Sequence, residues 1–321
     1  MQRSSPLPVL LCFDVEPDDR HVEGRPESWP GAEATPGMLE RWRRRLSRAT
    51  ARPARFSWFL RLDPQIAELY GTALWPVVRY GSVLRELAAA GDEIGLHVHT
   101  WRRDPQGAED RWVCDFTDGE WTAHCVRAAF AAFEEAFGRS CTTFRFGERW
   151  MSQAAFELLE RLGARFDLSL EPGHFDYASW DLKHHFHGTF PDCRQVPTWP
   201  YRPARSDFRR PGRWGLRRRL WVVPVSTAPV ANGTEPGSDV QTLFLSAPPR
   251  LFIDSLGALL DSADTRHLAI VARTDVGSRP DEAALADENL ASLERVASVS
   301  RRLEFVTPAT AVAMAEALRA G

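Results

Sequence analysis

Lysine is almost absent from this sequence of 321 residues. Of its 40 basic residues only Lys183 is a lysine, and the others are arginines. Such a bias is typical of a GC-rich genome, so the arginine runs Arg43–Arg45 and Arg217–Arg219 are interpreted as solvated faces rather than binding patches. The net charge of −3 also gives no reason to expect a nucleic-acid or anionic-membrane partner.

Cysteine is scarce, and its pattern excludes two kinds of small scaffold. There are five cysteines, an odd number, and no Cys-x-x-Cys spacing occurs. Neither a disulfide framework nor a zinc knuckle is therefore expected. The cysteines are Cys12, Cys114, Cys125, Cys141 and Cys193.

Long apolar runs are missing as well. No stretch approaches the roughly 20 residues that span a bilayer. The apolar run near the N-terminus is too short for a secretion signal and leads directly into acidic residues. The sequence therefore predicts a cytoplasmic protein without membrane insertion.

The sequence does contain a regular alternation of short apolar runs and amphipathic patterns. Eight runs are predicted strands: Pro8–Phe13, Arg55–Leu60, Glu93–Val98, Thr142–Phe146, Ala164–Leu170, Leu220–Val225, His267–Val271 and Leu303–Val306. Helices are predicted at Tyr80–Ala90, Trp121–Phe137, Ser152–Leu162, Asp281–Ser298 and Pro308–Leu318, several with Gly or Ser at their ends. This alternation predicts an α/β fold, a single (β/α) barrel of seven or eight strands over residues 1–321.

Two segments interrupt the alternation. Pro17–Gly37 has the composition of an acidic loop. Pro172–Gly215 is rich in Pro, His, Trp and Arg and has few apolar runs. Because a long irregular segment in a compact domain is usually functional or disordered, and this one is aromatic, we expect a folded insertion on the substrate side at about residues 172–215.

Chemistry-bearing residues follow the predicted strands, where parallel barrels place their catalytic groups. Asp14 and Glu16 come at the end of the first run, on one face of an extended chain. His97 and His99 end the third run and also share a face, roughly 7 Å apart at their Cα atoms. Two imidazoles at this spacing can share one metal ion, although hydrogen-bonded core histidines are the alternative.

Further charges follow the fourth and seventh runs. Arg145 lies between two phenylalanines, where an unpaired charge is costly, so it needs a carboxylate such as Asp14. Arg273 and Asp275 form a charged pair after the seventh run. A snorkelling arginine and a structural ion pair are the alternatives at these two places. The convergence of acids, histidines and arginine on strand ends is more specific than any one of these patterns.

The chain resembles the NodB-type polysaccharide deacetylases, a branch of the carbohydrate esterases, over roughly Val9 to Ala313. Leu11–Glu16 resembles the first motif of that family, Gly91–His99 the second and Phe144–Gly147 the third. Phe56–Phe59 resembles its second strand. The resemblance implies a β/α barrel that hydrolyses the N-acyl group of an amino sugar.

The resemblance also implies a role for each site residue. Asp14 is the expected general base, and Arg145 is expected to orient it and keep it ionised. Glu16, His97 and His99 are the expected ligands of a divalent metal ion, zinc or another transition metal. That ion would polarise the amide and lower the pKa of bound water.

Three departures from the family pattern stand out. The family spaces its histidines four apart, and here only His97 and His99 are available. Glu16 stands where Asp is commonest. Arg273 stands where the family offers a histidine as general acid, and arginine cannot donate a proton near neutral pH. Arg273 is therefore expected to stabilise developing charge or to bind a carboxylate or phosphate of the substrate.

The substrate is expected to be a glycan or a small molecule containing sugar. Trp101, Trp150 and Trp199 are the candidate stacking residues, although aromatic residues also fill cores. Two other functions remain open from sequence. One is a barrel that has lost its chemistry and only binds a glycan or partner, and the other is a hydrolase of a non-sugar amide.

Overall fold

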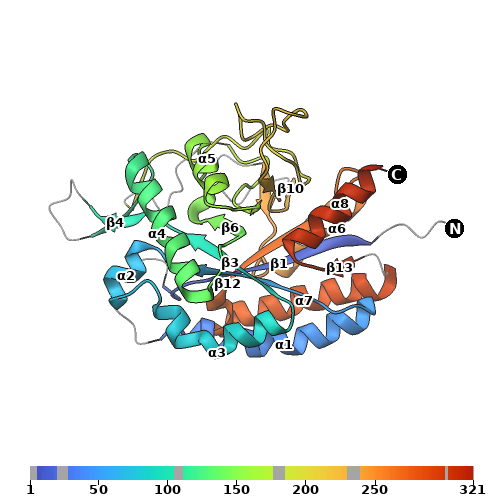
Figure 1. The fold of residues 1–321 in the computed structure, drawn as a ribbon. Helices are drawn as coiled ribbons and strands as arrows, with labels where there is room; N and C mark the ends of the chain where they lie inside the picture. Colours follow the sequence, from blue (N-terminus) through green and yellow to red (C-terminus); the bar gives the residue numbers. More distant parts are fainter. Residues whose placement is uncertain are drawn as a thin grey trace.

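The computed structural model describes residues 6–19, 28–104, 111–175, 185–229, 239–300 and 303–320. Its main element is a parallel sheet of eight strands that curls around a central axis (Figure 1). The strands are β1 (Leu7–Val15), β2 (Ser57–Arg61), β3 (Glu93–Val98), β6 (Thr143–Phe146), β7 (Phe166–Asp167), β9 (Trp221–Val222), β12 (Leu268–Arg273) and β13 (Leu303–Phe305). Each falls on one of the eight predicted runs, so the predicted α/β fold is confirmed.

The sheet runs in the order β12-β1-β2-β3-β6-β7-β9, and β13 pairs with β1. The first strand of the chain therefore pairs with strands from its last quarter. Between β9 and β12 irregular segments complete the barrel: the Ser226 amide donates to the Ala269 carbonyl at 3.0 Å, and Phe244 forms a parallel bridge with Val271. Seven of the eight strands, from β12 to β9 in this order, thus form a curled half-barrel. Between β9 and β12 there is no regular strand pairing in the described ranges.

Helices surround the sheet. They are α1 (Pro30–Thr50), α2 (Pro64–Tyr70), α3 (Trp75–Ala89), α4 (Gly119–Phe137), α5 (Gln153–Arg161), α6 (Pro249–Asp261), α7 (Pro280–Ser300) and α8 (Pro308–Ala320). The five predicted helices are among them. The expected Ser152 cap is present, because its side chain accepts from the Ala155 amide at 3.1 Å, and Gly138 ends α4 in the left-handed conformation.

The predicted loop at Pro17–Gly37 is wrong in its second half, since α1 begins at Pro30. Residues 20–27 lie outside the described ranges. Proline at the first helical position fits a helix start, and Gly31 is required by packing: a Cβ there would lie 2.3 Å from the Thr274 carbonyl oxygen. The helix forms because it packs on η3 (Thr274–Gly277), which local sequence cannot reveal.

The arginine runs are also not simply solvated, which corrects the interpretation from sequence. Arg43 pairs with the buried Asp92 at 2.7 Å, and Asp92 accepts further hydrogen bonds from Phe56 and Trp58. Arg218 is 3% exposed and reaches two glutamates of α5. Each arginine therefore ties a helix to its neighbours.

Two small sheets lie outside the barrel. One consists of β4 (Trp101–Arg103), β5 (Trp112–Asp115) and β8 (Phe186–His187), and the other of β10 (Thr227–Pro229) and β11 (Val240–Thr242). In the predicted insertion, residues 176–184 lie outside the described ranges. The rest packs on the barrel: Phe208 stacks on Phe156 of α5, and Tyr201 bridges to Val222 of β9. Its substrate-side role stays a prediction.

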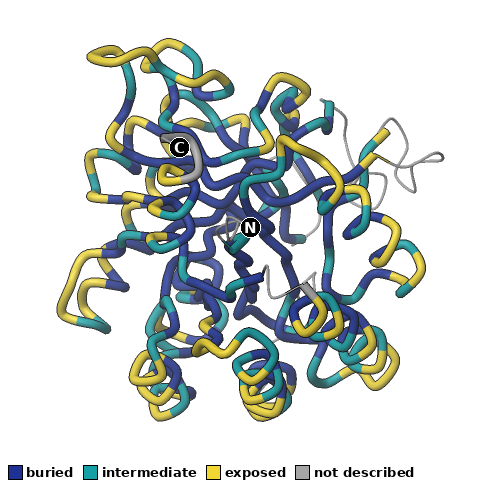
Figure 2. The backbone as a smooth tube through the Cα atoms, turned by 90° about the vertical axis from the view of Figure 1, so that its right-hand side faces the viewer, coloured by how far each residue is buried: buried dark blue, intermediate teal, exposed yellow. Residues whose placement is uncertain are grey.

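Alternate residues of β1 enter two separate hydrophobic clusters. Leu11 and Phe13 belong to the large cluster between sheet and helices, whereas Leu10 and Cys12 belong to a small one with side chains of β7, β9 and β12. This is the alternation of faces along a strand. Viewed along the barrel, buried residues gather in the strands and exposed ones on the outer helix surfaces (Figure 2).

The inner face of β1 leads to the candidate site. Asp14 and Glu16 continue the phase of Leu10 and Cys12, so they project into the barrel at the end where the strands finish. Ala311 and Val312 of α8 pack in the same small cluster. Helix α8 lies at the opposite end, where the strands begin (Figure 1).

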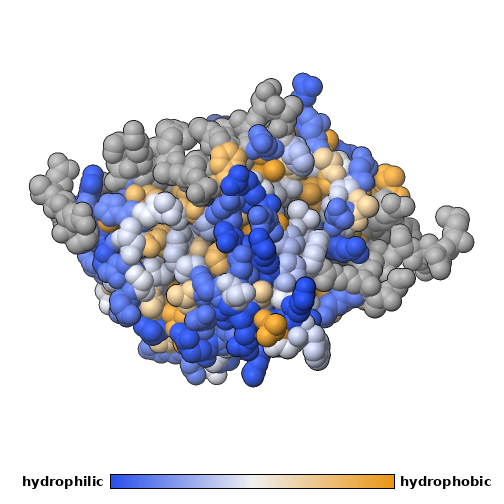
Figure 3. Space-filling view, turned by 90° about the horizontal axis from the view of Figure 1, so that it is seen from above, coloured by the Kyte–Doolittle hydropathy of each residue, from blue (hydrophilic) through white to orange (hydrophobic). Residues whose placement is uncertain are grey.

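The outer surface is mostly polar. Seen from above, hydrophilic colours cover most of the described surface, and hydrophobic ones form separate spots (Figure 3). The large apolar side chains that are exposed in the described ranges are Val78, Trp214, Leu216, Ile253 and Val299. None of the helices in these ranges combines the length and apolar character that crossing a bilayer requires.

Candidate active site

Three of the predicted residues meet at the strand-end mouth of the barrel. The Nε2 atom of His99 lies 3.3 Å from the Oε2 atom of Glu16, and Nε2 of His97 lies 3.8 Å from it. The two Nε2 atoms are 2.9 Å apart. All three side chains are buried, and their ligand atoms lie within 4.8 Å of one another.

This arrangement fits a metal ion by two observations. Ligands at about 2.1 Å around a tetrahedral ion lie roughly 3.4 Å from one another, close to the three distances here. Burial also lowers the pKa of His97 to about 4, which keeps the ring neutral as a ligand must be. Burial acts to raise the pKa of Glu16, but Arg273 and His99 outweigh it and hold this pKa well below 4.5.

The second nitrogen of His99 has two neighbours that favour different tautomers. The Trp101 indole donates to Nδ1 at 3.1 Å, which requires an unprotonated Nδ1. The Glu148 carboxylate lies 3.6 Å from the same atom. A neutral ring that binds a cation through Nε2 carries its proton on Nδ1, and Glu148 suits that proton. The Trp101 hydrogen bond thus belongs to the metal-free tautomer.

A glycine allows the His99 ring to lie against the chain. A Cβ on Gly147 would be 2.3 Å from Cε1 of His99, closer than real Cβ contacts come. Gly147 directly follows β6 and begins η1 (Gly147–Arg149). The Phe-Arg-Phe-Gly motif therefore supplies the Arg145 side chain and, at Gly147, the room that the His99 ring needs.

The expected ion pair between Arg145 and Asp14 is present. Nε of Arg145 lies 3.1 Å from both carboxylate oxygens, and both residues are buried. Arg145 also donates to the Leu168 carbonyl at 2.8 Å and lies 3.9 Å from Glu171. On its other side Asp14 lies 3.7 Å from Nδ1 of His97. Asp14 is thus held beside the three candidate ligands.

Arg273 lies beside Glu16 and is held by the protein itself. Its Nε is 2.7 Å from Oε1 of Glu16, its second terminal nitrogen donates to the Pro17 carbonyl at 2.8 Å, and Asp275 is 3.8 Å away. The register of β1 with β12 explains the contact, because Arg273 is the partner of Asp14 across the ladder. Burial raises the pKa of Asp275, although Arg273 and Arg279 oppose this.

The structure also brings in residues that sequence reasoning missed. Arg61 forms a buried ion pair with Asp63 at 2.8 Å and lies 4.0 Å from Glu16. Asp63 accepts from the His99 amide at 3.3 Å. Arg61 ends β2 and Asp63 follows it, so the same rule that found the other charges would have found these. Glu148 likewise lies two residues after β6, but the direction of its side chain depends on a positive φ of 57°, which the rule does not predict.

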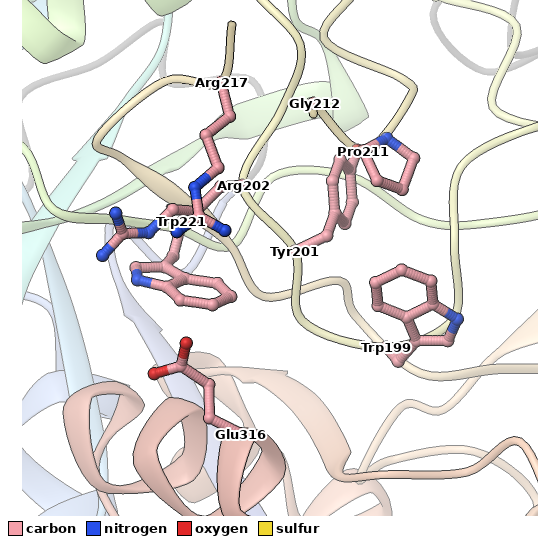
Figure 4. A pocket seen from close by; sticks show the side chains of 8 residues that line it. All are labelled: Trp199, Tyr201, Arg202, Pro211, Gly212, Arg217, Trp221 and Glu316. Carbon is pink, nitrogen blue, oxygen red and sulfur yellow. The ribbon is translucent and has the colours of Figure 1, made fainter. Parts of the chain in front are cut away.

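The three predicted tryptophans do not form a stacking platform at this site. Trp101 is 2% exposed, and its indole contacts the His99 ring. Trp150 stacks on Phe116 with ring centres 4.3 Å apart. Trp199 lines a pocket with Trp221, the first residue of β9, and Glu316 of α8, at the strand-start end of the barrel (Figure 4). Trp199 therefore lines a different pocket, and the substrate-binding role of Trp101 and Trp150 stays a prediction.

Comparison with known proteins gives similarity in structure but not in sequence. No family model and no curated protein matches the chain. A Mycobacterium smegmatis protein assigned as a polysaccharide deacetylase is 16% identical, with 100% of this chain and 95% of that one covered and a TM-score of 0.51. A Parabacteroides distasonis protein assigned as a glycoside hydrolase or deacetylase is 11% identical, with 98% and 72% covered and a TM-score of 0.60.

The fold is that of the polysaccharide deacetylases. The same fold also occurs in PuuE allantoinase, which is 13% identical, with 97% of this chain and 91% of that one covered and a TM-score of 0.54. At these identities the similarity establishes the barrel and its strand order, and it does not establish a substrate. The chemistry must be argued from the residues themselves.

Proposed function

We propose that this chain is a metal-dependent hydrolase that removes an N-acyl group, acetyl in the simplest case, from an amino sugar. The observation that carries the proposal is the meeting of Glu16, His97 and His99 within 4.8 Å, with the Asp14–Arg145 pair beside them. A buried carboxylate and two imidazoles form a donor set for zinc or a similar divalent ion.

The chain's own residues supply the proton transfers. Glu16, His97 and His99 would hold the ion, which when bound supplies Lewis acidity to an acyl carbonyl and to water. Asp14 removes a proton from the attacking water, and the contact with Arg145 holds the Asp14 carboxylate in place for that step. The water oxygen bonds to the acyl carbon and the C–N bond breaks. Asp14 then returns its proton to the leaving amine, which completes the balance.

Arg273 has a supporting role in this proposal. It cannot act as the general acid, because its guanidinium keeps its proton. Its contact with Glu16 moderates the negative charge of a metal ligand. Its side chain remains 28% exposed, so a carboxylate or phosphate on the substrate could still approach it. Asp275 steadies it from the other side.

The proposal is tested by metal content and turnover measured together. The wild-type chain should hold one divalent ion, measured by inductively coupled plasma mass spectrometry, and should release acetate from N-acetylated sugars. Asp14→Asn should retain the ion and lose about 10²–10⁴-fold in kcat, the usual contribution of a general base. Glu16→Gln and His97→Ala should lose the ion. A wild-type chain that binds the ion but hydrolyses no N-acyl compound would support a binding-only barrel.

A second candidate follows from the structural similarity to the allantoinase. That similarity favours a second reaction at the same site, the hydrolysis of an amide that is not part of a sugar. The substrate panel therefore includes allantoin beside N-acetylated sugars with and without an anionic group. Turnover of allantoin alone would replace the sugar substrate while keeping the metal and Asp14 in their roles.

A further inference from the structure

A second concave site lies at the end of the barrel opposite to the candidate active site. It is a pocket of about 240 Å³, formed where the segment after residue 199 passes over the start of β9 and over α8 (Figure 4). Its lining is Trp199, Tyr201, Arg202, Pro211, Gly212, Arg217, Trp221 and Glu316. The nine residues of β1 run from one end of the barrel to the other. An extended strand of this length spans roughly 25 Å, which is the separation of the two sites along the strand.

The pocket contains cations that the described part of the chain does not pair. Arg202 and Arg217 make no ion pair within the described ranges, and Nε of Arg202 is buried there without a hydrogen-bond partner. Their guanidinium groups are held over aromatic rings, Arg202 at 4.9 Å from Trp221 and Arg217 at 4.7 Å from Trp214. A guanidinium that is partly desolvated and lacks an anion is set to receive one.

Some of the other arginines in the same segment have acidic partners. Arg209 pairs with Asp207 at 2.9 Å, and Arg218 pairs with Glu157 at 3.1 Å. Acidic partners are therefore within reach of this part of the chain. Arg205, Arg213 and Arg219 make no ion pair in the described ranges either, so Arg202 and Arg217 are distinguished by lining the pocket and lying over aromatic rings.

The remaining walls suit a sugar ring. Trp199 offers a flat apolar face of the kind that packs on the C–H face of a pyranose. Trp221 is 8% exposed and lies under the Arg202 guanidinium, so it supports that cation. Tyr201 contributes only its ring, because its hydroxyl donates to the Phe208 carbonyl at 2.8 Å. Glu316 is exposed, points toward the pocket in Figure 4 and offers acceptors for sugar hydroxyls.

We propose that this pocket is a non-catalytic binding site for a sugar that carries a carboxylate or a phosphate. Arg202 and Arg217 bind the anionic group, Trp199 covers the ring, and Glu316 accepts from its hydroxyls. The cavity is smaller than the about 300–1,000 Å³ of drug-sized ligand sites, which limits the occupant to about one sugar residue. The proposal is independent of the proposed hydrolase activity.

The test is isothermal titration calorimetry on the full chain. Glucuronate, glucose 6-phosphate, neutral N-acetylglucosamine and inorganic phosphate are titrated separately. At least one of the two anionic sugars should bind, tighter than the neutral sugar and tighter than phosphate alone. Binding of glucuronate or of glucose 6-phosphate identifies which anion the pocket prefers.

Variants locate the binding. Arg202→Gln and Arg217→Gln should each weaken the affinity for the anionic sugar by about tenfold or more, as expected when a charge-assisted hydrogen bond is lost. Arg213→Gln is the matched control, since Arg213 is exposed in the same segment but does not line the pocket. Glu16→Gln should leave this affinity unchanged, which separates the pocket from the candidate active site.

Three results would overturn the proposal. They are no heat of binding from either anionic sugar at millimolar concentration, phosphate binding as tightly as the sugar phosphate, and an equal loss of affinity in Arg213→Gln and Arg202→Gln. Thermal unfolding of each variant verifies that the fold is retained. If the wild-type chain hydrolyses no substrate but binds the anionic sugar in this pocket, the binding-site proposal is supported and the hydrolase proposal fails.

Discussion

The two ends of the barrel treat arginine in opposite ways. Where the strands finish, Arg61, Arg145 and Arg273 each pair with a buried carboxylate of the chain. Where the strands begin, Arg202 and Arg217 have no such partner in the described ranges. A fully buried charge must be neutralised by the protein itself, or the fold does not form, whereas a charge at an open pocket can be left to solvent or to a ligand.

The largest effect is expected from breaking a pair at the strand-end site. Arg145→Ala leaves the Asp14 carboxylate buried without its cation, and we expect a loss of about 3–5 kcal/mol in the free energy of unfolding, measured by urea denaturation. Arg41→Ala, which removes an exposed pair with Asp287 at 2.9 Å, is the control and should cost about 0–1 kcal/mol. Equal losses in the two variants would contradict the comparison.

At the strand-start end, the buried His267 should respond to pH. Burial lowers its pKa to about 4, although its hydrogen bond to the Pro224 carbonyl opposes this. The unfolded chain has the ordinary value near 6.5 and binds the proton more readily. The stability that His267 contributes is therefore present above pH 6.5 and is lost as the pH falls toward 4.

That loss is up to about 3 kcal/mol at pH 4, from about 1.4 kcal/mol per pH unit. His267→Gln should flatten the dependence of the free energy of unfolding on pH between 6.5 and 4, measured by denaturation at a series of pH values. Burial also lowers the pKa of His97 to about 4, so His97 contributes to the slope in the same pH window. The comparison is therefore made against His97→Gln, with metal removed from both. An unchanged slope in His267→Gln would exclude the burial argument for this residue.

A smaller effect separates the two neighbours of His99. If Glu148 supports the metal-binding tautomer, Glu148→Gln should weaken metal affinity by about 10–100-fold. Trp101→Phe removes the donor that holds the other tautomer, so it should leave the affinity unchanged or raise it. Competition with a chromogenic chelator measures both. A loss in Trp101→Phe as large as that in Glu148→Gln would show that the indole only packs the ring.

The smallest effect is expected at the strand-start pocket. Arg202→Gln and Arg217→Gln remove charges that have no ion pair, so each should change the free energy of unfolding by no more than about 0.5 kcal/mol. Urea denaturation without ligand measures this. A loss above about 2 kcal/mol in either variant would mean that the arginine supports the fold, and the contrast between the two ends would disappear.

The sequence predicted the strands well because each is a short apolar run between breakers. It predicted Asp14, Glu16, His97 and His99 because residues that follow parallel strands share one mouth of the barrel. The start of α1 was missed for the opposite reason. Proline and glycine signal a loop locally, and only the distant Thr274 carbonyl, against which Gly31 packs, makes the helix favourable.

Pairings between distant residues were mostly beyond the sequence, and the Arg145–Asp14 pair is the exception. Arg273 faces Glu16 because β12 lies beside β1, and no local pattern states that neighbour relation. Trp199 was placed at the wrong end of the barrel for the same reason, since an insertion can pass over either mouth. Arg61 and Asp63 differ, because their signal at the end of β2 was present in the sequence and was overlooked.

The position of β1 in the sheet has a consequence for synthesis on the ribosome. β1 is the first strand to emerge, and its partners β12 and β13 come from residues beyond 267. During most of translation it can pair only with β2, and its other edge stays open. The second edge of β1 is therefore covered only after β12 and β13 have emerged, and a nascent chain stalled before β12 exposes an edge strand that invites aggregation.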